Sequence, residues 1–157
     1  MRLTDILLND YIKIPLDAKD RDDAIKKLVM LLGQSKVIDD TDQAYKAVLD
    51  REKIMTTGVG NGIAIPHCKD SSCPNFAVAM GVHNKGLNFE SIDKKDVRII
   101  FLLVGPENNP GLHIKLLSRI SRLMSNEDLR DELLDCKTAE DALNLLQEEE
   151  NYYFDLD

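Results

Sequence analysis

The run VRIIFLLV, residues 97–104, constrains the fold more than any other stretch of this sequence, because only its second residue is polar. An apolar run of this length suits a strand that is buried on both faces of a sheet. A second apolar run of strand length, FAVAMGV, occupies residues 76–82. Between the two runs, HNKG at residues 83–86 is expected to form a turn with its glycine at Gly86. Such strands need a layer of helices on each face of the sheet.

Helical patterns precede the two runs. From Asp20 onward, apolar residues recur every three or four positions and predict a helix that stops at Gly33. A second helix is predicted to begin near Thr41 or Asp42 and to end around residues 51–53.

Helical patterns also follow the runs. Asn109 is expected to cap a helix that has Pro110 at its first position. Another helix is expected from Ser125 or Asn126, and Thr138 is expected to cap a last one. Helices thus precede, interrupt and follow the strands. We predict an α/β protein, a three-layer α/β/α sandwich with a mixed β-sheet flanked by helices.

The signals near the two ends of the chain are weaker. YIKI, residues 11–14, is expected to form a short strand that ends at Pro15. The acidic tail, from about residue 148, is expected to fray. The length suits one core, so residues 1–157 are expected to form a single domain.

The charge balance narrows the possible partners. Twenty basic residues against 28 acidic ones give a net charge of −8, which argues against nucleic acid. An acidic surface favours a basic protein partner through electrostatic steering, although solubility alone would also explain it. No apolar run approaches the ~20 residues of a membrane span, and the N-terminus lacks a secretory signal. We therefore expect a cytoplasmic protein without direct membrane insertion.

Cysteine and histidine spacing gives no metal site. Cys68, Cys73 and Cys136 form no CxxC pair, which excludes a zinc ribbon and disfavours a disulfide framework. A cluster of His67, Cys68, Cys73 and His83 would match no common metal spacing.

The segment TGVGNGIAIPHCKD, residues 57–70, contains three glycines at alternate positions. It has neither the G-x-G-x-x-G of dinucleotide sites nor the G-K-[ST] of a P-loop, so a nucleotide loop is rejected. Closely spaced glycines instead allow sharp turns or close approach. Pro66 keeps the preceding residue extended, so His67 is expected at a strand end with a nearly fixed direction.

Taken alone, a histidine at a strand end is compatible with a structural role or a working one. No G-x-S-x-G elbow and no HExxH motif is present. Proton transfer or nucleophilic attack remains for His67, and histidine accepts phosphoryl groups covalently. His113, in the first turn of the helix after Asn109, and Arg51 are candidates to hold the added negative charge. Both also have ordinary structural explanations.

A family pattern connects these residues. REKIMTTGVGNGIAIPHCK, residues 51–69, resembles the phosphorylation-site signature of enzyme IIA domains of the bacterial sugar phosphotransferase system, in the fructose/mannitol/nitrogen-regulatory branch. LHIKLLSRISRLM, residues 112–124, is similar to the family helix that bears a second active-site histidine. The order of elements fits from about residue 3 to residue 146.

The resemblance implies a protein-to-protein phosphotransferase with a phosphohistidine intermediate. His67 would accept the group, through Nε2, from the phosphocarrier HPr or its nitrogen-branch counterpart and pass it to a cysteine of an enzyme IIB domain. His113 and Arg51 would frame the phosphoryl group, with no metal or organic cofactor. The acidic surface would then face a basic carrier.

The resemblance leaves two points open. In a regulatory binding module, phosphorylation of His67 would instead be a switch that controls binding to regulatory proteins. Cys68 stands where this family usually has glycine, so its side chain is expected to crowd the partner or shift the loop, and a redox role is a further possibility.

Overall fold

The structure is a computed structural model, and it describes residues 1–154. Its strands form one six-stranded mixed sheet. The strands are β1 (Ile12–Lys13), β2 (Gly58–Gly60), β3 (Ile63–Ala64), β4 (His67–Lys69), β5 (Ala77–Leu87) and β6 (Val97–Gly105). The helices are α1 (Arg21–Gln34), α2 (Thr41–Ile54), α3 (Pro110–Met124), α4 (Glu127–Asp135) and α5 (Ala139–Phe154), with 3-10 turns η1 (Leu3–Asp5) and η2 (Asn9–Tyr11).

Strand β6 lies at the centre of the sheet. It pairs antiparallel with β5 on one side and parallel with both β3 and β4 on the other. Strand β1 lies parallel to β5 at one edge, and β2 lies antiparallel to β3 at the other. Every residue of β6 except Arg98 is buried, so the predicted central strand covered on both faces is confirmed.

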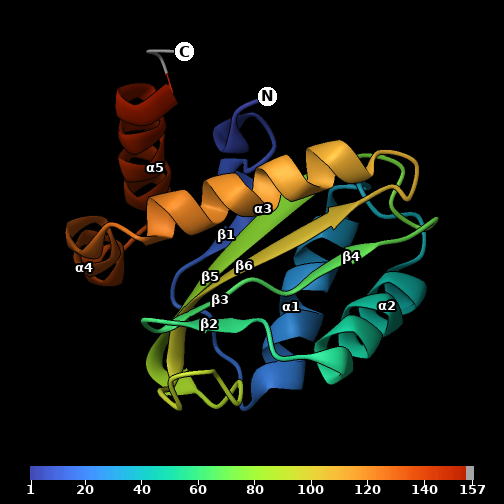
Figure 1. The fold of residues 1–157 in the computed structure, drawn as a ribbon, viewed down its shortest axis with the longest axis horizontal. Helices are drawn as coiled ribbons and strands as arrows, with labels where there is room; N and C mark the ends of the chain where they lie inside the picture. The colour runs from blue at the N-terminus through green and yellow to red at the C-terminus, as the bar shows by residue number, and fades with distance from the viewer. Residues whose placement is uncertain (155–157) are drawn as a thin grey trace.

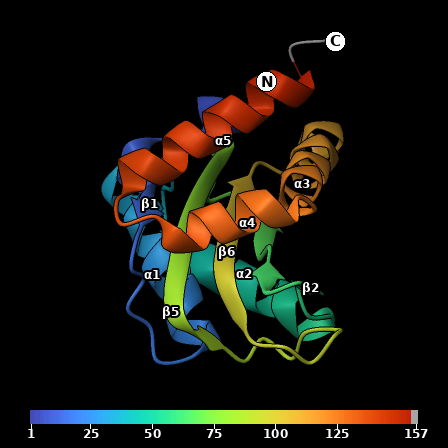
Figure 2. The same ribbon diagram turned by 90° about the vertical axis from the view of Figure 1, so that its left-hand side faces the viewer.

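Helices cover both faces of this sheet, as predicted. Figure 1 shows α3 crossing in front of β5 and β6, with α1 behind them, and Figure 2 shows the same arrangement from the side. Helix α1 contacts β5 and β6, and α2 contacts β4. On the other face α3 contacts β6, and α5 contacts β1 and both 3-10 turns. None of the helices in residues 1–154 combines the length and apolar character needed to cross a membrane.

The helix starts agree with the predicted capping residues. The Asn109 side chain accepts a hydrogen bond from the Leu112 N–H, and Pro110 is the first residue of α3. Asn126 caps α4 in the same way, and the Thr138 hydroxyl accepts from the Asp141 N–H at the start of α5.

The predicted turn at residues 83–86 is wrong. Strand β5 continues through these residues to Leu87, which pairs with Val97, and the register shifts between Val82 and Leu87. Gly86, with φ of +98°, takes up this irregularity within the strand. Residues 88–96 make the connection to β6 instead.

The predicted fraying of the acidic tail is also wrong within the described residues. Helix α5 continues to Phe154, because Glu150 is fully buried and anchors it. The Glu150 carboxylate accepts hydrogen bonds from the backbone N–H groups of Leu3 at 2.6 Å and Thr4 at 2.9 Å, and from the Thr4 hydroxyl at 2.7 Å. Residues 155–157 lie outside the described residues. At the other end, the predicted strand 11–14 is reduced to the two residues of β1.

Candidate functional site

The glycine segment forms a tight hairpin between β2 and β3. Gly60 and Gly62 have φ values of +103° and +76°, and Asn61 between them has +58°. Three successive residues in the left-handed region reverse the chain sharply, which explains why glycine occupies two of the three positions. The hairpin returns the chain to the edge of β6.

Strand β4 then places His67 beside the end of the central strand. Ile63 and Ala64 of β3 pair with the first half of β6, and His67 pairs with Leu103 in its second half. Pro66 lies between the two short strands, and its carbonyl accepts the Leu103 N–H at 3.0 Å. The expected extended approach to His67 is therefore present.

The imidazole of His67 is held in one tautomer. Its Nδ1 lies 2.9 Å from the Ile65 carbonyl oxygen, which only accepts hydrogen bonds, so Nδ1 carries the proton. The lone pair on Nε2 is then available. Burial lowers the pKa of His67 below its ordinary value; the Ile65 hydrogen bond opposes this effect, and the Arg51 charge adds to it. The ring is neutral at pH 7 and has a nucleophilic nitrogen.

His113 lies against His67 from the first turn of α3. The two ring centroids are 5.4 Å apart, with the planes tilted by 56°. The His113 side chain is buried, and neither ring nitrogen has a hydrogen-bond partner among the described residues. Burial, followed by the charges of His67 and Lys69, lowers the pKa of His113 to about 4. A buried polar side chain without a partner is unusual in a folded protein, and such groups occur at catalytic sites.

The two histidines face a shared cavity of about 380 Å³. Its lining residues are Ala47, Arg51, His67, Cys68, Lys69, His113, Ile114 and Leu117. Arg51 occupies the last turn of α2, where its Nη1 donates to the Met55 carbonyl at 3.0 Å. The structure thus brings together all three residues that the sequence predicts for the site.

Lys69 is a site residue that the sequence reasoning missed. It lies two positions after His67 in β4, and alternate residues of a strand project from the same face. The ammonium group is exposed and lines the same cavity as Arg51. Two cationic side chains beside two neutral imidazoles make this cavity suitable for an anion.

The surroundings of Cys68 indicate a packing role rather than a reactive one. Its side chain is buried, as is that of Cys73, and both are free thiols. A hydrogen bond with Cys73 and burial raise the pKa of Cys68, so it remains a protonated thiol rather than a nucleophilic thiolate. Among residues 1–154, no group of three or more histidine, cysteine or acidic side chains is arranged to hold a metal ion.

A larger cavity, of about 630 Å³, lies elsewhere, between residues 15–19 and 83–87. His83 lines it, but both ring nitrogens have partners. Nε2 donates to the Ala18 carbonyl at 2.8 Å, and Nδ1 accepts from the Gly86 N–H at 2.9 Å. His83 therefore offers no open nitrogen to that cavity.

Known proteins resemble this chain over most of its length. The family model described as "Phosphoenolpyruvate-dependent sugar phosphotransferase system, EIIA 2" matches residues 5–149. The fructose-specific EIIA component of Haloferax volcanii is 34% identical over 128 residues, which cover 82% of this chain and 83% of the relative. The fructose-specific EIIABC component of Bacillus subtilis is 33% identical over 94% of this chain, which spans only 23% of that relative's length.

A solved structure shows the same fold. The nitrogen regulatory protein IIA-Ntr of Neisseria meningitidis matches with a TM-score of 0.85 and 26% identity. The match covers 91% of this chain and 97% of the neisserial chain. The similarity in three dimensions therefore extends over most of the fold.

Proposed function

Because the chain belongs to the EIIA 2 family of the phosphoenolpyruvate-dependent sugar phosphotransferase system, a family of phosphoryl-transfer proteins, we propose that it carries the phosphoryl group on His67. The observation that carries this assignment is the pairing of the two histidines. One imidazole has its Nδ1 proton fixed and its Nε2 open. The other, whose ring centroid lies 5.4 Å away, is buried, and neither of its nitrogens has a hydrogen-bond partner within residues 1–154.

The fixed tautomer allows transfer without a separate proton-transfer step. Nε2 of His67 attacks the phosphorus atom of the donor phosphohistidine, the new P–N bond forms, and the P–N bond to the donor breaks. The proton on Nδ1 stays in place, donating to the Ile65 carbonyl. That carbonyl also stabilises the positive charge that the ring gains when Nε2 is phosphorylated.

The cationic and N–H groups of the cavity would stabilise the phosphoryl oxygens. The guanidinium of Arg51 has the fork geometry that suits two of these oxygens, and Lys69 adds a point charge. Neutral His113 can donate one N–H at the positive end of the α3 helix dipole. A bound phosphoryl group would therefore accept a hydrogen bond from a nitrogen that has no partner among the described residues.

In onward transfer, a cysteine thiolate of an enzyme IIB domain attacks the phosphorus and the Nε2–P bond breaks. His67 returns to its neutral Nδ1–H form.

The donor is HPr or its nitrogen-branch counterpart, and the compartment is the cytoplasm. Similarity to fructose-specific EIIA components supports a role in sugar uptake. Similarity to a nitrogen regulatory protein supports the alternative, in which the phosphoryl group on His67 switches binding to regulatory proteins.

Radiolabelling tests the assignment. Phosphoenolpyruvate labelled at phosphorus, with enzyme I and either carrier, should place one label on the wild-type chain and none on His67→Ala. His83→Ala is the matched control, because His83 lines the distant cavity, and it should be labelled like the wild type. Label that survives His67→Ala would contradict the assignment. Loss of the label when a IIB domain is added would support the transport role, and retention of the label would support the regulatory role.

A further inference from the structure

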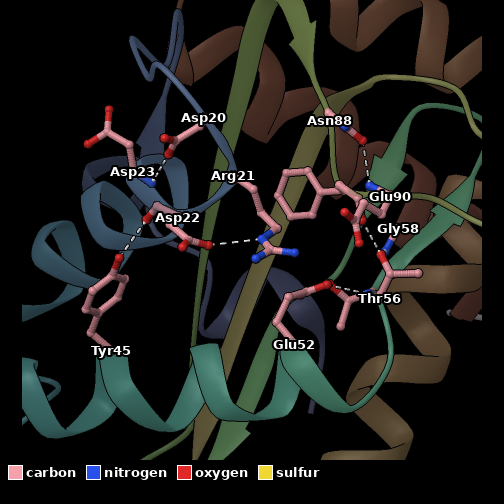
Figure 3. A network of polar contacts seen from close by, with 12 residues as sticks. Asp20, Arg21, Asp22, Asp23, Tyr45, Glu52, Thr56, Gly58, Asn88 and Glu90 are labelled. Carbon is pink, nitrogen blue, oxygen red and sulfur yellow. Dashed lines mark hydrogen bonds and ion pairs between the residues drawn. The ribbon is translucent and has the colours of Figure 1, made fainter.

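One buried carboxylate near the site has no part in the proposed transfer. Glu52 follows Arg51 in α2, and only 3% of its surface is exposed. Its carboxylate accepts hydrogen bonds from the Thr57 backbone N–H at 2.6 Å and from the Thr57 hydroxyl at 2.5 Å. Figure 3 shows the Glu52 side chain reaching from α2 toward the segment of Thr56 and Gly58. This carboxylate ties the end of α2 to the start of the β2–β3 hairpin.

Two further hydrogen bonds continue from Thr57 to the phosphorylation site. The Thr57 carbonyl accepts the Ile65 N–H at 3.0 Å across the base of the hairpin. The Ile65 carbonyl in turn accepts from Nδ1 of His67 at 2.9 Å. The N–H and C=O of one residue belong to different peptide planes, so this connection fixes positions rather than passing polarisation along one amide.

We propose that Glu52 is a positioning residue for phosphoryl transfer: by holding Thr57, it keeps the Ile65 carbonyl directed at Nδ1 of His67 and so fixes the tautomer that leaves Nε2 open. This inference rests on the proposed function of His67. Glu52 touches no reacting atom and acts only through the hairpin. Its negative charge has a second effect, since it raises the pKa of His67 against the lowering effect of burial.

The geometry explains why a carboxylate serves at this position. Thr57 offers two donors on the same side, a backbone N–H and a hydroxyl, and a carboxylate has two oxygens that can accept both. Hydrogen bonds to an ionised acceptor are the stronger kind, and burial protects them from exchange with water. The link therefore holds a strand only three residues long, β2, in a fixed place.

Side-chain ¹⁵N NMR of His67 tests the proposal without any phosphoryl donor. The wild-type spectrum should show a uniform Nδ1–H tautomer, and folded Glu52→Ala should show a mixture of Nδ1–H and Nε2–H forms. Phosphoryl acceptance by Glu52→Ala should fall on the order of 10- to 100-fold, as for other displaced supporting groups. Because the tautomer is read in the unphosphorylated protein, failure of this proposal is distinct from failure of His67 labelling.

Two further variants control for folding. Glu52→Gln keeps one acceptor for the Thr57 N–H and a donor for its hydroxyl, so it should retain the tautomer but show a lower His67 pKa and slower transfer. It serves as the test if Glu52→Ala does not fold. Glu150→Ala is the matched structural control, since Glu150 also binds two backbone N–H groups and a threonine hydroxyl, at η1.

The overturning results are specific. A folded Glu52→Ala with the uniform wild-type tautomer would overturn the proposal. A folded Glu52→Gln protein with mixed tautomers would also overturn it, because the amide still holds both groups of Thr57. A Glu150→Ala protein whose His67 tautomers mix as in Glu52→Ala would show that general loosening, rather than the Glu52 link, is responsible.

Discussion

At the scale of single residues, burial keeps His113 neutral and thereby couples stability to pH. Its pKa is about 4 in the folded protein, against 6.5 as the ordinary value. Between these values the unfolded chain binds more protons than the folded one, so stability is complete above pH 6.5 and falls as pH decreases toward 4. The difference corresponds to about 3 kcal/mol.

Urea unfolding of the wild type and of His113→Gln at pH 7 and pH 4 measures this contribution. Glutamine keeps a polar group but does not titrate, so the variant should lose about 3 kcal/mol less than the wild type over this pH interval. Other acidic and basic groups affect both proteins alike and cancel in the comparison. An equal loss in both proteins would show that His113 is not the group responsible.

Lys69 should contribute to phosphoryl acceptance through its charge. We expect Lys69→Gln to slow acceptance from the phosphorylated carrier about tenfold, less than the ~10²-fold or more of a buried donor, because solvent and salt screen an exposed ammonium. The slowing should shrink as salt is added. Lys19→Gln, at the distant cavity, is the control and should match the wild type. Equal rates for the two variants would exclude Lys69 from the site.

The sequence predicts some of these residues because their signals are local. His67 follows a proline and a glycine-rich hairpin, and His113 follows a helix cap, so each is visible within a few positions. Lys69 and Glu52 have no such signal. Strand alternation relates Lys69 to His67 only when β4 is known, and Glu52 meets Thr57 only when the hairpin is in place.

At the scale of elements, the glycine hairpin should be sensitive to a single methyl group. A β-carbon at Gly62 would meet nothing closer than the Asp96 carbonyl oxygen at 3.7 Å, so space is available, but φ there is +76°. Gly62→Ala should therefore cost roughly 1–2 kcal/mol of unfolding free energy through backbone strain alone. Chemical denaturation of the variant measures this cost.

Gly111 provides the matched comparison. It lies near the start of α3, and a β-carbon there meets nothing within 4 Å. Gly111→Ala should stabilise the protein by roughly 0.5–1 kcal/mol, because alanine loses less backbone freedom in a helix. If both substitutions changed stability in the same direction, strain at Gly62 would not be the cause.

Long elements were predictable and short ones were not, for a physical reason. Residues 97–104 and the helices repeat their pattern over many positions, and the structure confirms them. Strands β2, β3 and β4 are two or three residues long, too short for any period. Strands β3 and β4 form by pairing with β6, and β2 forms by pairing with β3. Pairing of β5 with β6 likewise overrides the local turn signal at residues 83–86, since Leu87 still pairs with Val97.

At the scale of the whole molecule, the net charge does not describe the site. The chain carries −8, whereas the charged side chains that line the site cavity are Arg51 and Lys69. The excess of acidic residues therefore lies on other surfaces, among them the exposed parts of α5. The positive charge at the cavity suits the phosphoryl group, whereas the negative net charge of the chain contributes to solubility and to longer-range steering of the carrier.

Glu150 should separate the stability of the molecule from its activity. Glu150→Ala leaves the two N–H groups at η1 and the Thr4 hydroxyl without their acceptor and removes the partner that lies 3.8 Å from Arg119. We expect a loss of about 3 kcal/mol in unfolding free energy, because buried donors lose a charged acceptor. Labelling of His67 at a temperature where the variant stays folded should match the wild type, since none of the residues that line the site cavity lies in α5 or η1. Unfolding curves and initial labelling rates on the same preparation check both parts. A variant with wild-type stability would show that this buried link contributes nothing to the fold, and slow labelling of the folded variant would show that the anchor of α5 also supports the site.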